Sequence, residues 1–331
     1  MKLILNKPAF KNLKPVKFKI GRKNLSIFGL KNIKIIDNKE NKKKFFFFED
    51  HKKKYFAKRV LNTEIHSLAF LKNLNSYLNS NKFNVPKIKK IKVLKNFKKK
   101  QFLIIFDYIT GNYIKNNSKD LKILSKAIFF LHKKLILYKA KDRIRKNTLK
   151  RLQLLEKIRR KYVTHKNHKN LFKYKLIKEI LVTGGDILKK YKSLLKNSQC
   201  IHGDLVPGNI LYGDKKIHFL DFEDSYYSYF PIEFDLALII ERHILVKKIS
   251  TKNKIKNIKI FLNTYLKNRK IKKFNYSFIE VLNFLTLRAL ITLISPILDK
   301  KKIDKNEINK FLKLYLINKK MKNTIEILNG K

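Results

Sequence analysis

The chain has 331 residues, of which 44% are hydrophobic, and a formal net charge of +56. This length and apolar content suffice for one large two-lobed domain or two ordinary domains, and they exclude an intrinsically disordered chain. A single cysteine, Cys200, excludes a framework of intramolecular disulfides and a cysteine-rich zinc site, so a reducing, cytoplasmic setting is expected.

Positive charge is spread along the whole sequence. The 80 basic residues comprise 70 lysines and ten arginines, with lysines in every segment. Specific recognition of phosphates and base edges prefers arginine, so an arginine-poor chain matches nucleic-acid binding poorly. We therefore interpret the charge as a general compositional bias without a specific nucleic-acid partner. Only nonspecific, salt-sensitive adhesion to polyanions is expected.

The sequence predicts neither a secretory signal nor a transmembrane segment. The start of the chain, Met1–Pro8, lacks a long uninterrupted apolar core. The longest apolar stretch, Phe284–Leu298, contains Arg288 and Pro296, so we expect a buried helix there rather than a membrane span.

The first hundred residues are expected to be rich in β-strands with one helix. The β-prone runs Phe45–Phe48 and Lys54–Val60 flank a polar turn at residues 49–51, a pattern typical of a hairpin. Apolar residues at helical spacing over residues 65–74 predict a helix, for which Thr63 is a candidate N-cap.

The second part of the chain is expected to be helical. The apolar run Phe102–Phe106 has the length of a buried strand, and residues 107–111 then break the pattern, which we interpret as a hinge. Apolar periodicity beyond it predicts helices over residues 121–137, 149–162 and 171–195, the last with a break at Gly184-Gly185. The sequence therefore predicts an α+β protein with a small β-rich N-lobe (residues 1–106) and a larger helical C-lobe (residues 107–331).

One window departs from the basic background. Residues 201–250 contain eight of the 24 acidic residues and only five basic ones. In this window a loop carries Asp204 and Asn209, and a short apolar strand at residues 217–220 leads into Asp221. Phosphoryl transfer needs a carboxylate that accepts the proton of the attacking hydroxyl, and oxygen ligands for Mg²⁺ on the phosphates. Asp204, Asn209 and Asp221 supply that set.

The pattern His-Gly-Asp-x4-Asn, followed by a strand and Asp-Phe-Glu, resembles the signature of the aminoglycoside phosphotransferase and choline kinase family, relatives of protein kinases. The resemblance implies a bilobal protein-kinase-like fold, ATP and Mg²⁺ as cofactors, and a small-molecule hydroxyl as acceptor. It also implies that Asp204 is the catalytic base and that Asn209 and Asp221 bind magnesium. The later Glu-Phe-Asp-Leu-Ala resembles the segment in which an aspartate, here Asp235, supports the catalytic loop, and His202 is interpreted as orienting that loop.

The resemblance extends to the nucleotide site. It assigns nucleotide contacts to Gly29, Asn32, Lys58, Glu64, Asp107 and Ile109. Gly29 and Asn32 match the phosphate loop, which has one glycine here where two are common, and backbone N–H groups there would cradle phosphate oxygens. Lys58 matches the strand lysine that neutralises the α- and β-phosphates, and Glu64 the helix glutamate that fixes it. The backbone of Asp107 and Ile109 would receive adenine.

Each of these residues, taken alone, has a simpler interpretation. Asp204 and Asn209 are common turn residues beside Pro-Gly. Lys58 is one lysine among 70 and would by composition be a solvated surface residue, and Glu64 could complement a helix dipole. The complete set favours catalysis, because a turn does not require Asp221 after the following strand.

Three functions stay open at this point. An active kinase of a sugar, amino alcohol or amino acid is favoured by the complete catalytic set. A protein kinase is disfavoured by Gly203 in place of an arginine, by Glu223 in place of a glycine, and by the absence of Ala-Pro-Glu before Asp235. A non-catalytic basic binding protein on a degenerate kinase scaffold is supported only by the single-glycine loop and the short interval between Lys58 and Glu64. Lysine-rich helices after the hinge favour acceptors of neutral or negative character.

Overall fold

The computed structural model describes residues 14–15, 36–37, 45–50, 53–61, 65–94, 101–164, 174–195, 198–298 and 305–327. Contacts divide the chain into two compact units. The first, called the sheet unit, combines residues 2–113 with residues 208–223. The second, called the helical unit, comprises residues 114–207 and 224–331. The segment 208–223, which follows the catalytic loop, therefore belongs with the N-terminal strands.

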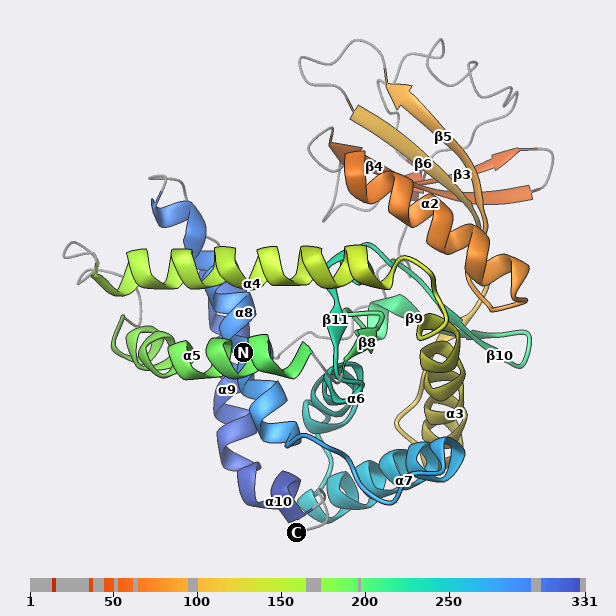
Figure 1. Cartoon of the computed structure of the whole chain (residues 1–331). Helices are drawn as coiled ribbons and strands as arrows, with labels where there is room; N and C mark the ends of the chain where they lie inside the picture. Colours follow the sequence, from red (N-terminus) through yellow and green to blue (C-terminus); the bar gives the residue numbers. More distant parts are fainter. Residues whose placement is uncertain are drawn as a thin grey trace. The chain divides into compact units, whose positions relative to one another are not determined.

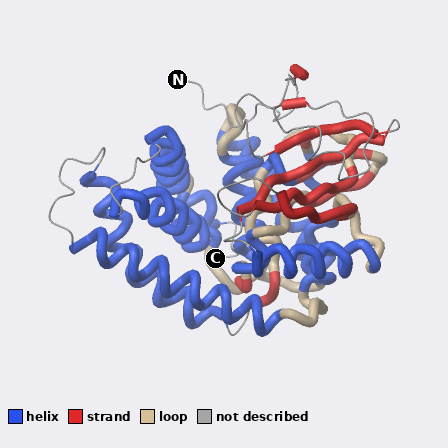
Figure 2. The backbone as a smooth tube through the Cα atoms, turned by 90° about the horizontal axis from the view of Figure 1, so that it is seen from above, coloured by secondary structure: helices blue, strands red, loops and turns tan. Residues whose placement is uncertain are grey.

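The sheet unit is built on a six-stranded antiparallel sheet, whose strands are red in Figure 2. Its order is β1 (Lys14–Pro15), β2 (Ile36–Asp37), β3 (Phe45–Asp50), β4 (Lys53–Leu61), β6 (Gln101–Asp107) and β5 (Ile88–Leu94). The predicted hairpin is confirmed as β3 and β4, with Phe45 opposite Lys58 and Asp50 opposite Lys53. Its turn is shorter than expected, because residues 49 and 50 belong to the ladder.

The predicted helix is α2 (Ile65–Ser80), which connects β4 to β5. The side chain of Asn75 fixes this helix to the start of β5: its Nδ2 donates to the Pro86 carbonyl at 2.8 Å, and its Oδ1 accepts from the Ile88 N–H at 3.0 Å. The Thr63 cap lies outside the described residues.

A second, three-stranded sheet completes the sheet unit, in the order β10 (Lys216–Phe219), β9 (Ile210–Gly213) and β7 (Asn112–Tyr113). The Phe219 N–H donates to the Asn84 carbonyl at 3.1 Å, and the Phe219 ring stacks on Phe83 at 5.7 Å. These contacts explain why residues from the second half of the chain fold onto the first.

The helical unit is a bundle of helices with a small sheet of two short strands (Figure 1). Its long helices are α3 (Ser118–Leu135), α4 (Lys141–Thr164), α5 (Tyr174–Leu194), α7 (Thr251–Arg269), α8 (Phe278–Leu298) and α9 (Lys305–Lys320). Its shorter elements are β8 (Gln199–Cys200), η5 (Asp224–Tyr227), β11 (Tyr229–Phe230), α6 (Glu233–Ile239), the π-helix η6 (Ile240–Leu245) and α10 (Lys322–Ile327). The 3₁₀ turn η4 (Pro207–Asn209) spans the boundary of the two units in sequence.

Side chains cap the N-termini of two helices. Asn117 caps α3 by accepting from the Asp120 N–H at 2.8 Å, and Ser250 caps α7 by accepting from the Asn253 N–H at 3.2 Å. Helices α3 and α7 pack against each other, and the buried apolar stripe of α3 explains the periodicity seen in the sequence.

The break predicted at Gly184-Gly185 is wrong, because α5 runs through both glycines. The glycines allow close packing instead. A Cβ on Gly184 would lie 2.8 Å from Leu287 Cδ2, and one on Gly185 would lie 3.0 Å from Arg159 Nη2. A contact with distant residues therefore explains both glycines, and no turn is needed.

Helix α8 is the core of the helical unit. Its Phe284 packs edge-on against the stacked pair Phe230 and Phe234, whose ring centroids are 4.8 Å apart. Among the described residues it is the single helix long and apolar enough to cross a membrane, over Phe278–Pro296. The sequence predicts a buried helix here rather than a membrane span, because Arg288 and Pro296 interrupt the apolar stretch. Since 61% of that stretch is buried inside the protein, the expected role of a core helix agrees with the packing.

Candidate active site

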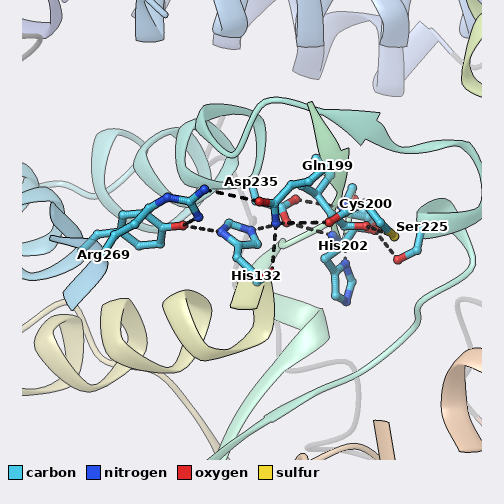
Figure 3. Close-up of polar contacts among 11 residues, drawn as sticks. His132, Gln199, Cys200, His202, Ser225, Asp235 and Arg269 are labelled. Carbon is cyan, nitrogen blue, oxygen red and sulfur yellow. Dashed lines mark hydrogen bonds and ion pairs between the residues drawn. The ribbon is translucent and has the colours of Figure 1, made fainter. Parts of the chain in front are cut away.

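The predicted catalytic loop is held in the helical unit by the carboxylate of Asp235 (Figure 3). Asp235, in the first turn of α6, is fully buried. Its Oδ2 accepts from the His202 N–H at 2.9 Å, and its Oδ1 accepts from the Gly203 N–H at 2.8 Å. One side chain thus fixes two consecutive amides immediately before Asp204, which places Asp235 where a loop-supporting residue is expected.

The buried His132 completes this network. Its Nε2 lies 3.0 Å from Asp235 Oδ2, and its Nδ1 lies 2.6 Å from the Tyr265 hydroxyl. Burial lowers the pKa of His132 despite the hydrogen bond and the negative charge of Asp235, so the imidazole is neutral. A carboxylate only accepts, which makes Nε2 the donor and leaves Nδ1 to accept from Tyr265. His132 is therefore a packed core histidine with a specific tautomer.

The loop itself is tightly constrained. Gly203 has a φ of +83°, a conformation that favours glycine. A Cβ there would lie 2.7 Å from Ser228 Cβ. The buried His202 accepts from the Asp204 N–H through Nδ1 at 3.3 Å. Asp204 is half-buried, so its side chain remains accessible while its backbone is fixed.

The predicted metal ligands Asn209 and Asp221 lie at one end of the β9–β10 hairpin in the sheet unit. Ile210 pairs with Phe219, and the next residue, Leu220, donates its N–H to the Asn209 carbonyl at 2.9 Å. Asp221 follows directly with a φ of +59°, an uncommon conformation that an aspartate tolerates. The hairpin register therefore brings together two residues that the sequence separates.

Lys58 of β4 meets the same region. Its Nζ lies 3.0 Å from both carboxylate oxygens of Asp221 and 2.7 Å from Glu223 Oε2. Burial disfavours the charge of Lys58, but the two carboxylates outweigh burial and raise its pKa, so the ammonium stays charged. Lys58 is the only lysine that is buried among the residues whose burial is described, and the interpretation as a solvated surface lysine is wrong.

The remaining nucleotide contacts are only partly described. Gly29, Asn32 and Glu64 lie outside the described residues. Asp107 is the last residue of β6, and its N–H donates to the Lys87 carbonyl at 3.0 Å, which leaves only its carbonyl for an adenine. Ile109 follows in the irregular segment before β7.

The donor set suits Mg²⁺. Asp221 supplies carboxylate oxygens and Asn209 a carboxamide oxygen, the ligand types that hard cations prefer. Within the described residues no group of three or more His, Cys, Asp or Glu side chains could hold a metal on its own. A metal bound by Asn209 and Asp221 would therefore complete its coordination with phosphate oxygens and water, as Mg²⁺ usually does.

Sequence reasoning missed two arginines next to the catalytic loop. Arg151 of α4 and Arg288 of α8 both lie against Asp224, the first residue after the Asp-Phe-Glu motif. The sequence offered Arg288 only as an interruption of an apolar stretch. A charge inside an otherwise apolar core helix was the signal that could have identified it, since such a charge requires a partner.

The helical unit, the antiparallel sheet and the Asp235-supported loop together define a phosphotransferase with the bilobal protein-kinase-like fold, as expected. The chain belongs to the phosphotransferase enzyme family, whose model matches residues 33–248, more than half of its length. A comparison with curated protein sequences found no match.

Solved structures share this fold at low sequence identity. An AMP-bound spectinomycin phosphotransferase, APH(9)-Ia, is 16% identical, with a TM-score of 0.57, and the match covers 91% of this chain and 94% of that one. The amicoumacin kinase hAmiN, in complex with AMP-PNP, Ca²⁺ and Ami, is also 16% identical, with a TM-score of 0.56 and the same coverage. The choline kinase LicA from Streptococcus pneumoniae is 13% identical, with a TM-score of 0.55, covering 91% of this chain and 98% of that one.

Proposed function

We propose that this phosphotransferase transfers the γ-phosphoryl group of ATP to a hydroxyl of a small molecule in a Mg²⁺-dependent reaction. The observation that carries the proposal is the ion pair between Lys58 and Asp221, which are 163 positions apart in sequence. A strand lysine that meets the carboxylate predicted to hold the metal is the arrangement that phosphoryl transfer requires, because both groups must face the nucleotide phosphates.

The reaction needs few protein groups. The acceptor oxygen forms a bond to the γ-phosphorus while the bond to the β,γ-bridging oxygen breaks, ADP leaves, and the hydroxyl proton passes to Asp204. Lys58 would neutralise phosphate charge, and Asn209 and Asp221 would hold Mg²⁺. When bound, Mg²⁺ supplies electrostatic stabilisation of the phosphate oxygens. Asp235 and His202 would keep the Asp204 backbone in one position, so that no reorganisation is needed during transfer.

The contacts of Lys58 also bear on the order in which ATP and Mg²⁺ bind. Its ammonium contacts both oxygens of Asp221 and also pairs with Glu223. A metal on Asp221 would compete with Lys58 for these oxygens. We infer that ATP and Mg²⁺ bind together, because the phosphates give Lys58 a replacement partner.

The relatives support a nucleotide and a divalent cation in this site. The amicoumacin kinase contains AMP-PNP with Ca²⁺, and the spectinomycin phosphotransferase contains AMP. Their acceptors differ, since one is a choline kinase and another a spectinomycin phosphotransferase. The family therefore supports the reaction and leaves the acceptor to be found.

The test is phosphoryl transfer from [γ-³²P]ATP to a panel of sugars, amino alcohols and hydroxy acids, with Mg²⁺ or with EDTA. We expect Asp204→Ala to lower kcat by roughly 10²-fold or more, because a positioned base contributes about that factor. Asp142→Ala changes an exposed aspartate of α4 and serves as the matched control. Equal turnover by wild type and Asp204→Ala would contradict the proposal, and transfer to protein substrates alone would indicate a protein kinase.

A further inference from the structure

Two arginines share one carboxylate beside the catalytic loop of the helical unit. Arg151 donates from Nη1 to Asp224 Oδ1 at 3.2 Å. Arg288 places Nη2 3.6 Å from Asp224 Oδ2, which is an ion pair but longer than a hydrogen bond. The cluster of Arg151, Arg288 and Asp224, called here the arginine cluster, therefore carries more positive than negative charge.

The arginine cluster is attached directly to the catalytic loop. Asp224 begins η5, and the next residue, Ser225, donates its hydroxyl to the His202 carbonyl at 3.0 Å. A Cβ placed on Gly203 would lie 3.4 Å from the Asp224 carbonyl oxygen. The backbone of η5 therefore packs against the two residues that precede Asp204, and the charge of Asp204 acts on Arg288 of the cluster.

Arg288 is short of hydrogen-bond partners. Its Nη1 is covered by the protein, yet it has no hydrogen-bond acceptor among the described residues. Its guanidinium lies over the Phe234 ring, 5.1 Å from the centroid. Buried donors are normally satisfied, so Arg288 Nη1 retains an unused hydrogen-bond donor next to the cluster.

The charges around Arg288 leave its guanidinium without full compensation. Burial and the neighbouring charge of Arg151 lower the pKa of Arg288, although Asp224 and Asp204 act in the opposite direction. The local negative charge thus falls short of what a buried guanidinium needs. The cluster is partly exposed through its other two members, since 26% of the Arg151 side chain and 31% of Asp224 are exposed, against 13% of Arg288.

We propose that the arginine cluster binds an oxyanion, a carboxylate or a phosphate, that is carried by the hydroxyl acceptor. This inference rests on the proposed function, because it assigns the acceptor of that reaction. A guanidinium matches planar oxyanions with parallel N–H donors and keeps its charge in a partly buried site. An acceptor anchored there by its anion would present a hydroxyl on a neighbouring carbon towards Asp204.

The turnover experiment uses acceptors that differ only in the anion. Glycerate, glycerol 3-phosphate and glycerol form one set, and gluconate, glucose 6-phosphate and glucitol form another. We expect a carboxylate or phosphate member to exceed its neutral counterpart by roughly tenfold or more in kcat/KM, about the contribution of a hydrogen bond between charged groups. Within each set, the acceptor with the highest kcat/KM shows whether the arginine cluster prefers a carboxylate or a phosphate. Neutral members that are equal or better substrates would overturn the inference and leave the proposed function intact.

The binding experiment does not depend on turnover. Calorimetry with inorganic phosphate, at physiological salt to suppress nonspecific adhesion, compares wild type with Arg288→Gln. We expect roughly tenfold weaker binding in the variant. Arg145→Gln removes an exposed arginine of α4 and should bind phosphate like wild type. Asp204→Ala should also retain phosphate binding, so failure of the catalytic proposal and failure of this one are distinguishable.

A second variant, Arg151→Gln, tests the cluster in case Arg288→Gln does not fold. Arg151 is more exposed than Arg288 and contacts the other oxygen of Asp224, so Arg151→Gln is expected to keep the fold and to weaken phosphate binding severalfold. Circular dichroism checks each variant. Unchanged phosphate affinity in folded Arg288→Gln, or equal affinity in Arg151→Gln and Arg145→Gln, would refute the arginine cluster as an anion site.

Discussion

Replacement of Asp235 by asparagine tests whether one carboxylate organises the catalytic loop. The carboxylate accepts three hydrogen bonds: from the His202 N–H at 2.9 Å, the Gly203 N–H at 2.8 Å and His132 Nε2 at 3.0 Å. An amide has a single acceptor oxygen. In its better orientation the oxygen keeps His202 and His132, while the NH₂ group faces the buried N–H of Gly203.

The loss of stability expected for Asp235→Asn follows from these hydrogen bonds. One charge-assisted hydrogen bond is lost, which is worth about 1.5–3 kcal/mol, and the remaining two become weaker because the acceptor is neutral. We therefore expect Asp235→Asn to lower the free energy of unfolding by about 2–4 kcal/mol. Because the loop carries Asp204, kcat should fall while nucleotide affinity changes little.

Urea unfolding monitored by circular dichroism measures the stability, and Asp142→Asn on the exposed face of α4 is the control. A kinase assay with saturating ATP measures the rate. A loss of less than about 0.5 kcal/mol, the range of an ordinary surface substitution, would refute the assigned hydrogen-bond network. Unchanged kcat with the expected loss of stability would show that the carboxylate stabilises the fold without positioning the loop.

Further substitutions test other parts of the molecule. Gly203→Ala should destabilise by about 3 kcal/mol or more in urea unfolding, because its φ of +83° is strained for alanine and the new Cβ clashes with Ser228. Gly208→Ala, with nothing within 4 Å, should change stability by less than about 0.5 kcal/mol. His243 is buried, and burial lowers its pKa to about 3. The unfolded state therefore binds more protons below the ordinary value of about 6.5, and stability falls as the pH drops from about 6.5 towards 3. His243→Gln should flatten this slope by up to about 1.4 kcal/mol per pH unit in acid unfolding curves. Lys58→Met should keep the fold by circular dichroism and lower kcat/KM for ATP by roughly 10²-fold, and wild-type kinetics in this variant would contradict its proposed role.

Local features were predictable from the sequence. The β3–β4 hairpin and α2 follow from periodicity and turn residues within a few positions. The grouping of Asp204, Asn209 and Asp221 was also predictable from their spacing, because a short loop and a hairpin separate them in sequence. The sequence therefore predicts chemistry whose residues lie within one continuous segment.

Long-range packing was not predictable in the same way. The function of Gly184 depends on Leu287, a residue of another helix about one hundred positions away, so a turn was expected where a close contact exists. Glu223 was noted as part of a motif, but its ion pair with Lys58 requires the hairpin to fold back onto the sheet. The cluster around Arg288 depends on three separate elements, and no spacing rule connects them.

The distribution of basic residues between surface and interior separates compositional bias from function. A bias that adds lysine acts on solvated positions, because these tolerate it. Where the burial of a lysine is described, every lysine other than Lys58 is half-buried or exposed. Burying an ammonium without paired carboxylates is costly, so bias alone does not place Lys58 between Asp221 and Glu223. Arginine, which is scarce here, takes partly buried positions such as Arg288, where a planar fork can pair with an anion. In a chain of charge +56, burial and pairing thus distinguish two cations from the rest: Lys58, which we propose for the nucleotide phosphates, and Arg288, which we propose for the anion of the acceptor.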